Sequence, residues 1–315
     1  MKQEFYSHGK LLLTAEYLVL DGADALAFPT KFGQSLAVDS GKKNTIEWKS
    51  YDHNESLWLD FCFSIEEIKL FNRKVENDRD RLLSILMNAH KINSSFLGNT
   101  DGFSIVTKLD FPNNWGLGTS STLINNVSKW ANLDPYKLLN VTFGGSGYDI
   151  ACAQNNTAIT YQLIYNNENS HLVENVSKRL INQVLFNPVF KNHLYFVYLN
   201  KKQDSREGIA QYKRNTSNLS EAILKVNQIT QSIIVCDVLE DFNTLIDKHE
   251  QLISKIINQK PIKQELFSDF NGSIKSLGAW GGDFILATCE SNPTIYFKSK
   301  GFDIVLSFDQ MIKSV

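Results

Sequence analysis

The chain has 315 residues, a hydrophobic fraction of 43%, a charged fraction of 21% and a formal net charge of −2. These values allow a sizeable core in one or two domains, and they argue against a nucleic-acid-binding protein, which carries a basic surface. The four cysteines are widely spaced without a CxxC pair, so neither a zinc site nor a disulfide framework is predicted. No apolar run approaches the about 20 residues of a membrane span, and no signal peptide is visible. We therefore expect a cytoplasmic protein that binds no membrane.

The N-terminal half begins with two apolar runs within residues 10–20, where the pattern alone does not separate helix from strand. The segment from Gly102 to Phe111 alternates apolar and polar residues, which predicts a strand that Pro112 ends. A glycine loop follows, and then a helix whose hydroxyl cluster Thr119–Thr122 stands where N-caps belong. This strand, glycine loop and helix form the most informative unit of the sequence.

The rest of the chain mixes strands and helices in an irregular order, which is typical of an α+β protein in two parts. The polar run 166–178 predicts a boundary, so we expect domains at 1–175 and 176–315. The other predicted elements are a short helix from Asp134-Pro135 to Asn140, strands at 158–165 and 193–199, apolar helical stripes at 219–233 and 242–256 before Pro261, and strands around a glycine turn in the tail.

The glycine loop PNNWGLGTSST, residues 112–122, predicts an anion site. Its glycines let the backbone approach a ligand closely, and the helix behind it presents free N–H groups and a positive dipole end. The hydroxyls add ligands for phosphate oxygens or a magnesium ion. No Walker loop, complete GxGxxG or GxSxG motif is present. Taken alone, the loop is equally compatible with a tight turn before a capped helix.

Two more glycine clusters follow, GGSGYDIA at residues 144–151 and GAWGGD at residues 278–283. The first surrounds a single carboxylate, Asp149, and the second leads into an apolar strand. Taken alone, each is typical of a turn.

Four motifs in order give the chain its resemblance to a known family. HGKLLLTAEY, PNNWGLGTSS, GSGYDIA and LGAWGGDFILA resemble the motifs of the GHMP kinases, which include galactokinase, homoserine kinase, mevalonate kinase and phosphomevalonate kinase. The match is collinear from residue 8 to about residue 290. Glu16-Tyr17, the sequence around Asp149 and the acid that ends GAWGGD are more similar to phosphomevalonate kinases than to mevalonate kinases.

The resemblance implies an α+β fold with an N-terminal nucleotide-binding domain and a C-terminal ferredoxin-like domain. It implies that ATP and Mg²⁺ are bound, with Ser120 at the metal. It also implies that Asp149 accepts the proton of the acceptor hydroxyl and that Lys10 lies beside it. The residues that would wrap the triphosphate are Gly116, Leu117, Gly118, Thr119, Ser120 and Ser121.

The same resemblance implies an acceptor pocket for a small-molecule substrate. The loop QDSREG at 203–208 is similar to a Ser-rich segment that lines this pocket in related kinases, and the third glycine cluster would shape its floor. The residues expected there are Glu16, Tyr17, Ser146, Gly147, Ser205, Arg206, Gly278, Ala279 and Gly281.

The chain departs from the family in the segment before Asp149. Mevalonate kinase-like members carry a helical insert there with a glutamate that helps to hold magnesium. Here DPYKLLNVTF offers Leu138 and Leu139 instead, so a second metal ligand is missing or comes from elsewhere. Trp115 and Trp280 are bulky beside their glycines, where they would cover the adenine, narrow the acceptor pocket or pack in the core.

Three functions stay open at this point. The first is a kinase for a small alcohol or a phosphorylated alcohol, with mevalonate or phosphomevalonate favoured. The second is a catalytically degenerate protein that binds nucleotide or metabolite. The third is a decarboxylase of a diphosphorylated acid. The sequence identifies neither the acceptor nor the oligomeric state.

Overall fold

The computed structural model describes residues 2–99, 101–166, 176–203, 205–215 and 219–313. Contacts between residues divide the chain into two compact units, each built from segments that are separate in sequence. Unit 1 comprises Met1–Gly9, Phe32–Asn113 and Leu117–Gln154, and unit 2 comprises Lys10–Lys31, Asn114–Gly116 and Asn155–Val315. The predicted domains, 1–175 and 176–315, are contiguous and so have other boundaries than these units; they stay a prediction.

Unit 1 is built on strands in the order β4-β3-β5-β2, with β1 beside β2. The β3 and β5 strands are parallel, while β3 with β4 and β2 with β5 are antiparallel. Both β1 and β2 continue into unit 2. The strand bounds are β1 Gln3–Leu12, β2 Ala25–Gly41, β3 Thr45–Tyr51, β4 Leu57–Ser64 and β5 Gly102–Leu109.

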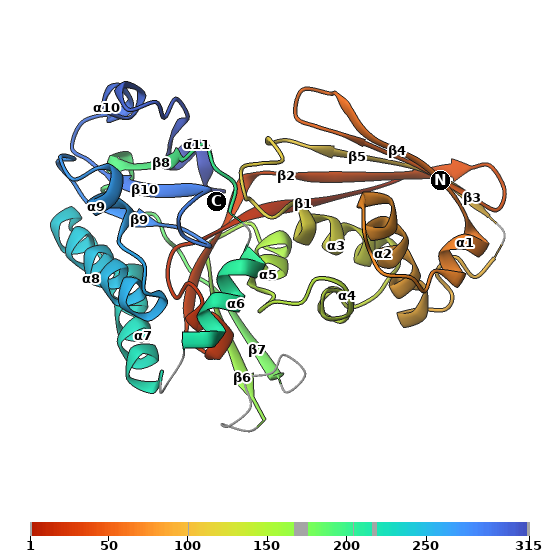
Figure 1. The fold of residues 1–315 in the computed structure, drawn as a ribbon, viewed down its shortest axis with the longest axis horizontal. Helices are drawn as coiled ribbons and strands as arrows, with labels where there is room; N and C mark the ends of the chain where they lie inside the picture. Colours follow the sequence, from red (N-terminus) through yellow and green to blue (C-terminus); the bar gives the residue numbers. More distant parts are fainter. Residues whose placement is uncertain (1, 100, 167–175, 204, 216–218, 314–315) are drawn as a thin grey trace. The chain divides into compact units, whose positions relative to one another are not determined.

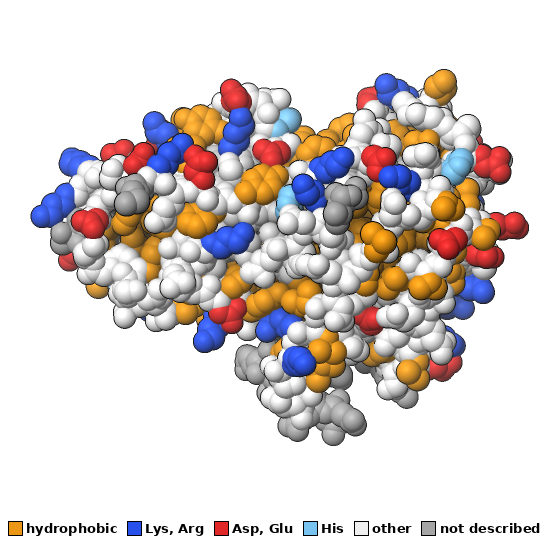
Figure 2. Space-filling model, turned by 180° about the vertical axis from the view of Figure 1, so that it is seen from behind, with side chains coloured by type: hydrophobic (Ala, Val, Ile, Leu, Met, Phe, Trp, Pro, Cys, Tyr) orange, Lys and Arg blue, Asp and Glu red, His pale blue; other side chains and the backbone are white. Residues whose placement is uncertain are grey.

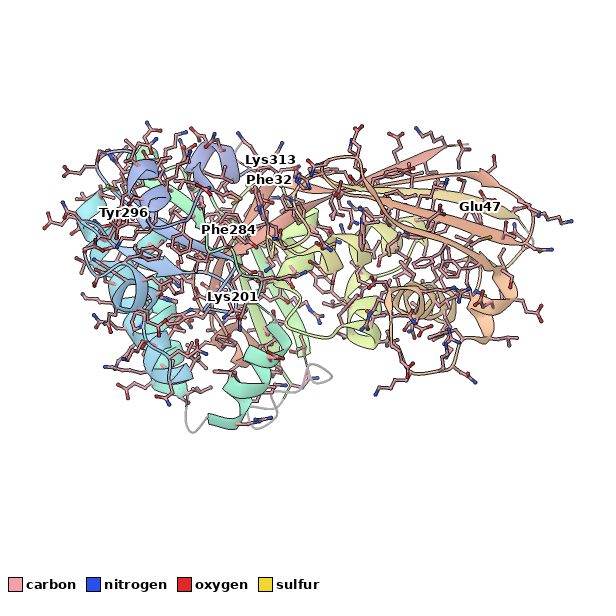
Figure 3. The ribbon with its side chains drawn as sticks, turned by 45° about the horizontal axis from the view of Figure 1, so that its top comes forward. Phe32, Glu47, Lys201, Phe284, Tyr296 and Lys313 are labelled. Atoms are coloured by element: carbon pink, nitrogen blue, oxygen red, sulfur yellow. The ribbon has the colours of Figure 1, made fainter. Side chains whose placement is uncertain are left out.

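Helices cover one face of the unit 1 strands (Figure 1). The strand β3 shows the reason for this cover. Its residues Ile46 and Trp48 are buried, while Glu47 and Lys49, which alternate with them, are exposed. Glu47 is labelled in Figure 3. Alternation with period two puts all the apolar residues on one face, which must be covered. The covering helices are α1 Ile65–Leu70, α2 Asp78–Ile92, α3 Thr119–Trp130, α4 Pro135–Thr142 and α5 Tyr148–Gln154.

Unit 2 contains two groups of strands. In the first group, β6 pairs antiparallel with Ala25–Ala27 of β2 and with β7. The second group is a four-stranded antiparallel sheet in the order β11-β8-β10-β9. The strand bounds are β6 Ile159–Tyr165, β7 Val176–Gln183, β8 Leu194–Tyr198, β9 Ile274–Ser276, β10 Phe284–Thr288 and β11 Val305–Ser307.

The long helices α7 and α8 pack against each other, and α8 contacts β9 of the four-stranded sheet (Figure 1). The predicted α+β class is therefore confirmed. The helices of unit 2 are α6 Ser205–Asn215, α7 Ser220–Ile234, α8 Leu239–Ile257, α9 Ile262–Leu266, α10 Thr294–Ser299 and α11 Phe308–Met311, with 3₁₀ turns η1 Leu18–Asp21 and η3 Lys191–His193.

Two predictions about helix ends are wrong. The N-cap of α3 is Gly118, without a side-chain cap, rather than a residue of the hydroxyl cluster. The α8 helix ends at Ile257, because Asn258 adopts the left-handed conformation with φ +52° and caps it before Pro261 is reached.

One predicted strand is a helix. The aromatic and β-branched residues of the tail favour a strand locally, but Thr294–Ser299 forms α10. Asn292 Oδ1 accepts a hydrogen bond of 2.9 Å from the N–H of Thr294, the first residue of this helix. Phe297 is buried against Phe267 and Phe270, so tertiary packing overrides the local preference.

The surface carries charges of both signs, which Figure 2 shows interspersed over the face that it presents. This agrees with the small net charge of −2. Among the described residues, no helix combines the length and the apolar character that crossing a membrane requires.

Candidate functional site

The start of α3 is the candidate phosphate site of unit 1. Gly118 adopts the left-handed conformation, φ +93° and ψ +42°, and no side chain caps the helix. The first N–H groups of a helix have no partner within it, so at this end they point outward with the positive end of the helix dipole. Ser120 in the first turn is exposed. This geometry suits an anion.

The other hydroxyls of the first turns serve the loop itself. Ser121 Oγ donates to the carbonyl oxygen of Gly118 at 2.9 Å, and Thr119 Oγ1 donates to Asn113 Oδ1 at 3.2 Å. Thr122 Oγ1 donates to Gln34 Oε1 of β2 at 2.8 Å. These bonds hold the loop in shape, and Ser120 stays exposed.

Buried amides fix α3 to its neighbours in unit 1. Asn126 Nδ2 donates to the carbonyl oxygen of Gln34 at 2.8 Å, and its Oδ1 accepts from Ser7 Oγ at 2.6 Å. Asn125 Nδ2 donates to the same Ser7 at 2.8 Å, and Gln154 Nε2 of α5 donates to Asn125 Oδ1 at 3.0 Å. Satisfied polar networks of this kind rigidify a core. The helices α3 and α5 are therefore locked to each other and to the sheet.

Asp149, the predicted proton acceptor, is the second residue of α5 rather than a turn residue. Its Oδ1 is buried and accepts no hydrogen bond from the described residues. Three glycines with positive φ precede the helix, Gly144 at +69°, Gly145 at +98° and Gly147 at +90°. Ser146 and Gly147 are both buried. Since a buried acceptor without a donor costs free energy, Asp149 is placed to receive a donor from a ligand.

The segment that lacks the expected glutamate is α4. Leu138 and Leu139 belong to the apolar core of unit 1, with exposed fractions of 0% and 4%. Among the described residues, no group of three His, Cys, Asp or Glu side chains is arranged to hold a metal ion. The position of the missing glutamate has therefore become a core position.

Two of the predicted site residues that belong to unit 2, Lys10 and Gly116, lie near Asp283. Lys10 is half-buried in β1, and burial raises the pKa of Asp283 although the charge of Lys10 opposes that rise. The Cα of Gly116 packs on the Asp283 carboxylate, because a Cβ there would lie 2.2 Å from Cγ of Asp283. Trp115 packs on Tyr198 and Phe284, so of its three expected roles the structure shows core packing.

Glu16, predicted to bind the acceptor, is fully buried beside a buried lysine. Its Oε1 accepts a hydrogen bond from Lys275 Nζ. Lys275 also donates to the carbonyl oxygen of Ser276 at 2.7 Å and lies 3.6 Å from Glu250 Oε2. Glu250 in turn accepts from Ser276 N and Oγ. We call Glu16, His249, Glu250 and Lys275 the buried charge cluster.

The buried charge cluster has two carboxyl groups for one ammonium group. Burial raises the pKa of Glu16 to about 7, although Lys275 lowers it, and burial also raises the pKa of Glu250. Burial and the charge of Lys275 hold the pKa of His249 well below its usual range. His249 is therefore neutral, and its Nε2 accepts from Ala15 N at 2.9 Å. The cluster thus retains a proton on a carboxyl group near neutral pH.

Tyr17 joins the Glu16 segment to the third glycine cluster and to α6. Its hydroxyl donates to the carbonyl oxygen of Ala279 at 2.7 Å, and its ring stacks on Tyr212 at 5.4 Å. A Cβ at Gly208 would lie 2.3 Å from that hydroxyl oxygen, so α6 passes directly against it. The side chains of Ser205 and Arg206, also predicted to face the acceptor, lie outside the described residues.

The third glycine cluster is a tight turn with positive φ at four of its six residues. These are Gly278 at +63°, Trp280 at +55°, Gly281 at +73° and Asp283 at +52°. The Trp280 ring is buried at 2% exposure, 6.0 Å from Lys275 Nζ, and borders an open pocket of 450 Å³ at the end of α8.

The sequence reasoning missed Lys275, Glu250, His249 and Asp283 as site residues. A lysine in the short buried strand β9 was a possible signal, because buried lysines need partners. His249 was visible only as a member of the α8 stripe. The roles of Asp149, Lys10, Ser120 and the acceptor residues stay predictions.

Comparison with known proteins gives structural relatives only. No family model matches the sequence, and no curated protein matches it. Mevalonate kinase from Methanococcus jannaschii is 15% identical, with a TM-score of 0.71 over 100% of this chain and 99% of that chain. Galactokinase from Lactococcus lactis, complexed with galactose, is 14% identical, with a TM-score of 0.67 over 99% and 95%.

A third similar structure carries a nucleotide analogue. Phosphomevalonate kinase from Streptococcus pneumoniae, in complex with phosphomevalonate and AMPPNP, is 17% identical, with a TM-score of 0.66 over 95% of each chain. All three are GHMP kinases. The chain therefore has the GHMP kinase fold over its whole length, as the resemblance of its motifs predicted. At these identities the likeness establishes the fold, and the activity is argued from the site.

Proposed function

We propose that the chain is an ATP-dependent phosphotransferase that moves the γ-phosphate of ATP onto a small metabolite. The start of α3 carries this proposal, because Gly118 leaves the first N–H groups without a side-chain cap and Ser120 beside it is exposed. The GHMP kinase fold supports a nucleotide at this place. The AMPPNP bound to the similar phosphomevalonate kinase supports ATP as the nucleotide.

The triphosphate would be wrapped by Gly116, Leu117, Gly118, Thr119, Ser120 and Ser121. The Ser120 hydroxyl and the phosphate oxygens would hold Mg²⁺, which neutralises charge on the triphosphate. The residues present fit such an ion, since magnesium keeps several waters and needs only one or two protein groups beside substrate phosphates. The leucines of α4 are compatible with this arrangement, in which the nucleotide supplies most of the ligands.

In the transfer step, Asp149 would accept the proton of the acceptor hydroxyl through its unpartnered Oδ1. The Lys10 ammonium would stabilise negative charge that develops on the transferring group. Phosphoryl transfer requires mainly positioning and charge neutralisation, and the hydrogen bonds between α3 and α5 would hold the phosphate loop and Asp149 in place relative to each other.

The acceptor we favour is mevalonate or phosphomevalonate. The similarity to kinases of both compounds and the Glu16-Tyr17 pair support this choice. Glu16 would act on the acceptor through Tyr17 and Lys275 rather than by direct contact, because its carboxylate is fully buried. Gly278, Ala279 and Gly281 would form the turn against which the acceptor lies.

The test is ADP release measured with MgATP across mevalonate, phosphomevalonate, homoserine and galactose. We expect turnover with one of the first two, and loss of turnover in excess chelator. Ser120→Ala should raise the magnesium concentration needed for half-maximal rate. ADP together with carbon dioxide and phosphate from a diphosphorylated acid would support a decarboxylase. ATP binding without turnover on any acceptor would identify a binding protein.

A further inference from the structure

Three consecutive residues after β1 each attach to a different part of unit 2. Ala15 N donates to His249 Nε2 of α8 at 2.9 Å, and the Glu16 carboxylate is paired with Lys275 of β9. The Tyr17 hydroxyl donates to a main-chain carbonyl of the third glycine cluster at 2.7 Å. The α8 helix and the β9 strand are themselves in contact (Figure 1). The segment is therefore fixed residue by residue within one unit.

The backbone of this segment is strained at Tyr17. Its φ of +63° and ψ of −48° lie outside the regions that side chains favour. Leu18 N donates to the carbonyl oxygen of Glu16 at 2.8 Å, which closes a γ-turn of the rare, strained form. Ala15 also has a positive φ, of +65°. Such strain persists only where the surroundings hold it, and it is concentrated at functional sites.

The Tyr17 side chain joins this γ-turn to a second strained turn. Its hydroxyl donates to the carbonyl oxygen of Ala279, which stands between Gly278 with φ +63° and Trp280 with φ +55°. Its ring is 7% exposed and stacks on Tyr212 at 5.4 Å. A single hydrogen bond thus links the γ-turn to the turn proposed to lie against the acceptor.

Lys275 connects the same two segments from the inside. It is fully buried in β9, the strand that leads into the third glycine cluster. Its Nζ donates to Glu16 Oε1 and to the carbonyl oxygen of Ser276 at 2.7 Å, and it lies 3.6 Å from Glu250 Oε2. A buried ion pair adds little stability compared with apolar residues of similar volume. What this pair supplies is a fixed position of Glu16 relative to β9.

We propose that Lys275 is a positioning residue for the acceptor, which through its ion pair with Glu16 holds the Tyr17 γ-turn against the third glycine cluster. This role deepens the proposed function and rests on it, because the acceptor is proposed to lie against that cluster. It explains why a lysine occupies a fully buried strand. It also explains why the strained Tyr17 is kept, since its hydroxyl reaches Ala279 from this conformation.

Tyr17→Phe separates this role from simple packing, because it removes the hydroxyl and keeps the ring on Tyr212. We expect the KM for the acceptor to rise about 2–10-fold, which corresponds to the loss of one hydrogen bond. The KM for ATP should stay nearly unchanged, since Thr119–Ser121 of the phosphate site belong to unit 1. Tyr212→Phe is the matched control, because it removes the other hydroxyl of the ring pair, which donates to Asp21 Oδ2 at 2.6 Å. That control should leave the acceptor KM unchanged, and an equal rise in both variants overturns the proposal.

A double-mutant cycle on the full-length enzyme tests Lys275 itself. Lys275→Met is combined with Glu16→Gln, so that neither charge of the pair is left without its partner. If Lys275 acts through Tyr17, this background raises the acceptor KM, and Tyr17→Phe has no further effect in it. Should this background not fold, Glu16→Gln alone replaces it, and the effect of Tyr17→Phe should be smaller there than in the unaltered enzyme.

An equal effect of Tyr17→Phe in both backgrounds, or a rise in the KM for ATP instead of the acceptor, overturns the proposal and leaves the kinase function standing. Absence of turnover by the unaltered enzyme with every acceptor removes the proposed function, and the role of Lys275 with it.

Discussion

At the scale of single residues, two carboxylates of this chain differ in their access to a ligand. Glu16 is fully buried and its Oε1 accepts from Lys275, although its Oε2 has no hydrogen-bond partner among the described residues, whereas Asp149 is only half-buried. Asp149 has a buried Oδ1 without a donor among the described residues, which is unfavourable unless a ligand supplies one. The first is therefore suited to holding structure, and the second to chemistry.

Asp149→Asn tests this difference directly. The amide keeps the size of the side chain but cannot accept the proton, so kcat should fall by about 10²–10⁴-fold. ATP affinity should change little or rise slightly, because a negative charge is lost. Both quantities are measured on one preparation, with circular dichroism to check folding. Turnover within about twofold of the unaltered enzyme would reduce Asp149 to a structural residue.

Residues in local motifs could be found from the sequence, and residues in long-range pairs could not. Gly118 and Ser120 stand in a strand, loop and helix pattern that is read within about 20 positions. Lys275 and Glu16 are 259 positions apart, and no local pattern around either residue indicates that the other is its partner. Asp283 was visible as the end of GAWGGD, but its contact with Gly116 depends on the fold.

At the scale of elements, the central unit is α3 with the glycine loop before it. The helix was predicted correctly because its apolar spacing is regular, whereas its cap was not. Glycine at the N-cap replaces the expected hydroxyl because only glycine adopts φ +93° without strain. The α10 helix was missed because the packing of Phe297 decides its form.

Gly118→Val should weaken ATP binding strongly, since a side chain there obstructs the approach of phosphate to the backbone. Valine in the left-handed region also costs about 1–2 kcal/mol of stability. Gly301→Val is the control, because Gly301 has φ +88° with no atom near its missing Cβ, and it lies in the turn after α10. Calorimetry should show normal ATP affinity for this control and a large loss for Gly118→Val. Equal affinities in two folded variants would remove the phosphate-loop assignment.

At the scale of the whole molecule, the fold was within reach of the sequence because four motifs kept their order along the chain. The division into units could not be predicted from the sequence, because β1 and β2 each run from one unit into the other. The boundary between the units falls inside both strands. The buried charge cluster lies wholly in unit 2, where it joins the segment after β1 to α8 and β9. It therefore links the stability of unit 2 to pH.

The pH dependence follows from Glu16, whose pKa in the folded chain is about 7. The folded state holds this proton more tightly than the unfolded state, in which the pKa of glutamate is about 4.3. The stability from this group is thus present at low pH and is lost as pH rises to about 7.

Glu16→Gln isolates that contribution. The variant keeps Glu250 as the partner of Lys275 at 3.6 Å. His249 and Glu250 are present in both proteins, so most of their own pH dependence is common to the two stability curves. From pH 5 to pH 8, the unfolding free energy of the unaltered protein should fall by about 2–3 kcal/mol relative to the variant. Parallel stability curves from urea titrations would contradict a protonated cluster.

The most direct test of the central claim follows the γ-phosphate itself by phosphorus NMR. The mixture contains the full-length chain, MgATP and the acceptor in whose presence ADP is formed. The account predicts one new phosphate signal on the acceptor for each ADP formed, and no such signal with Asp149→Asn in the same time. Release of the γ-phosphate as inorganic phosphate, with no phosphorylated acceptor, would contradict it.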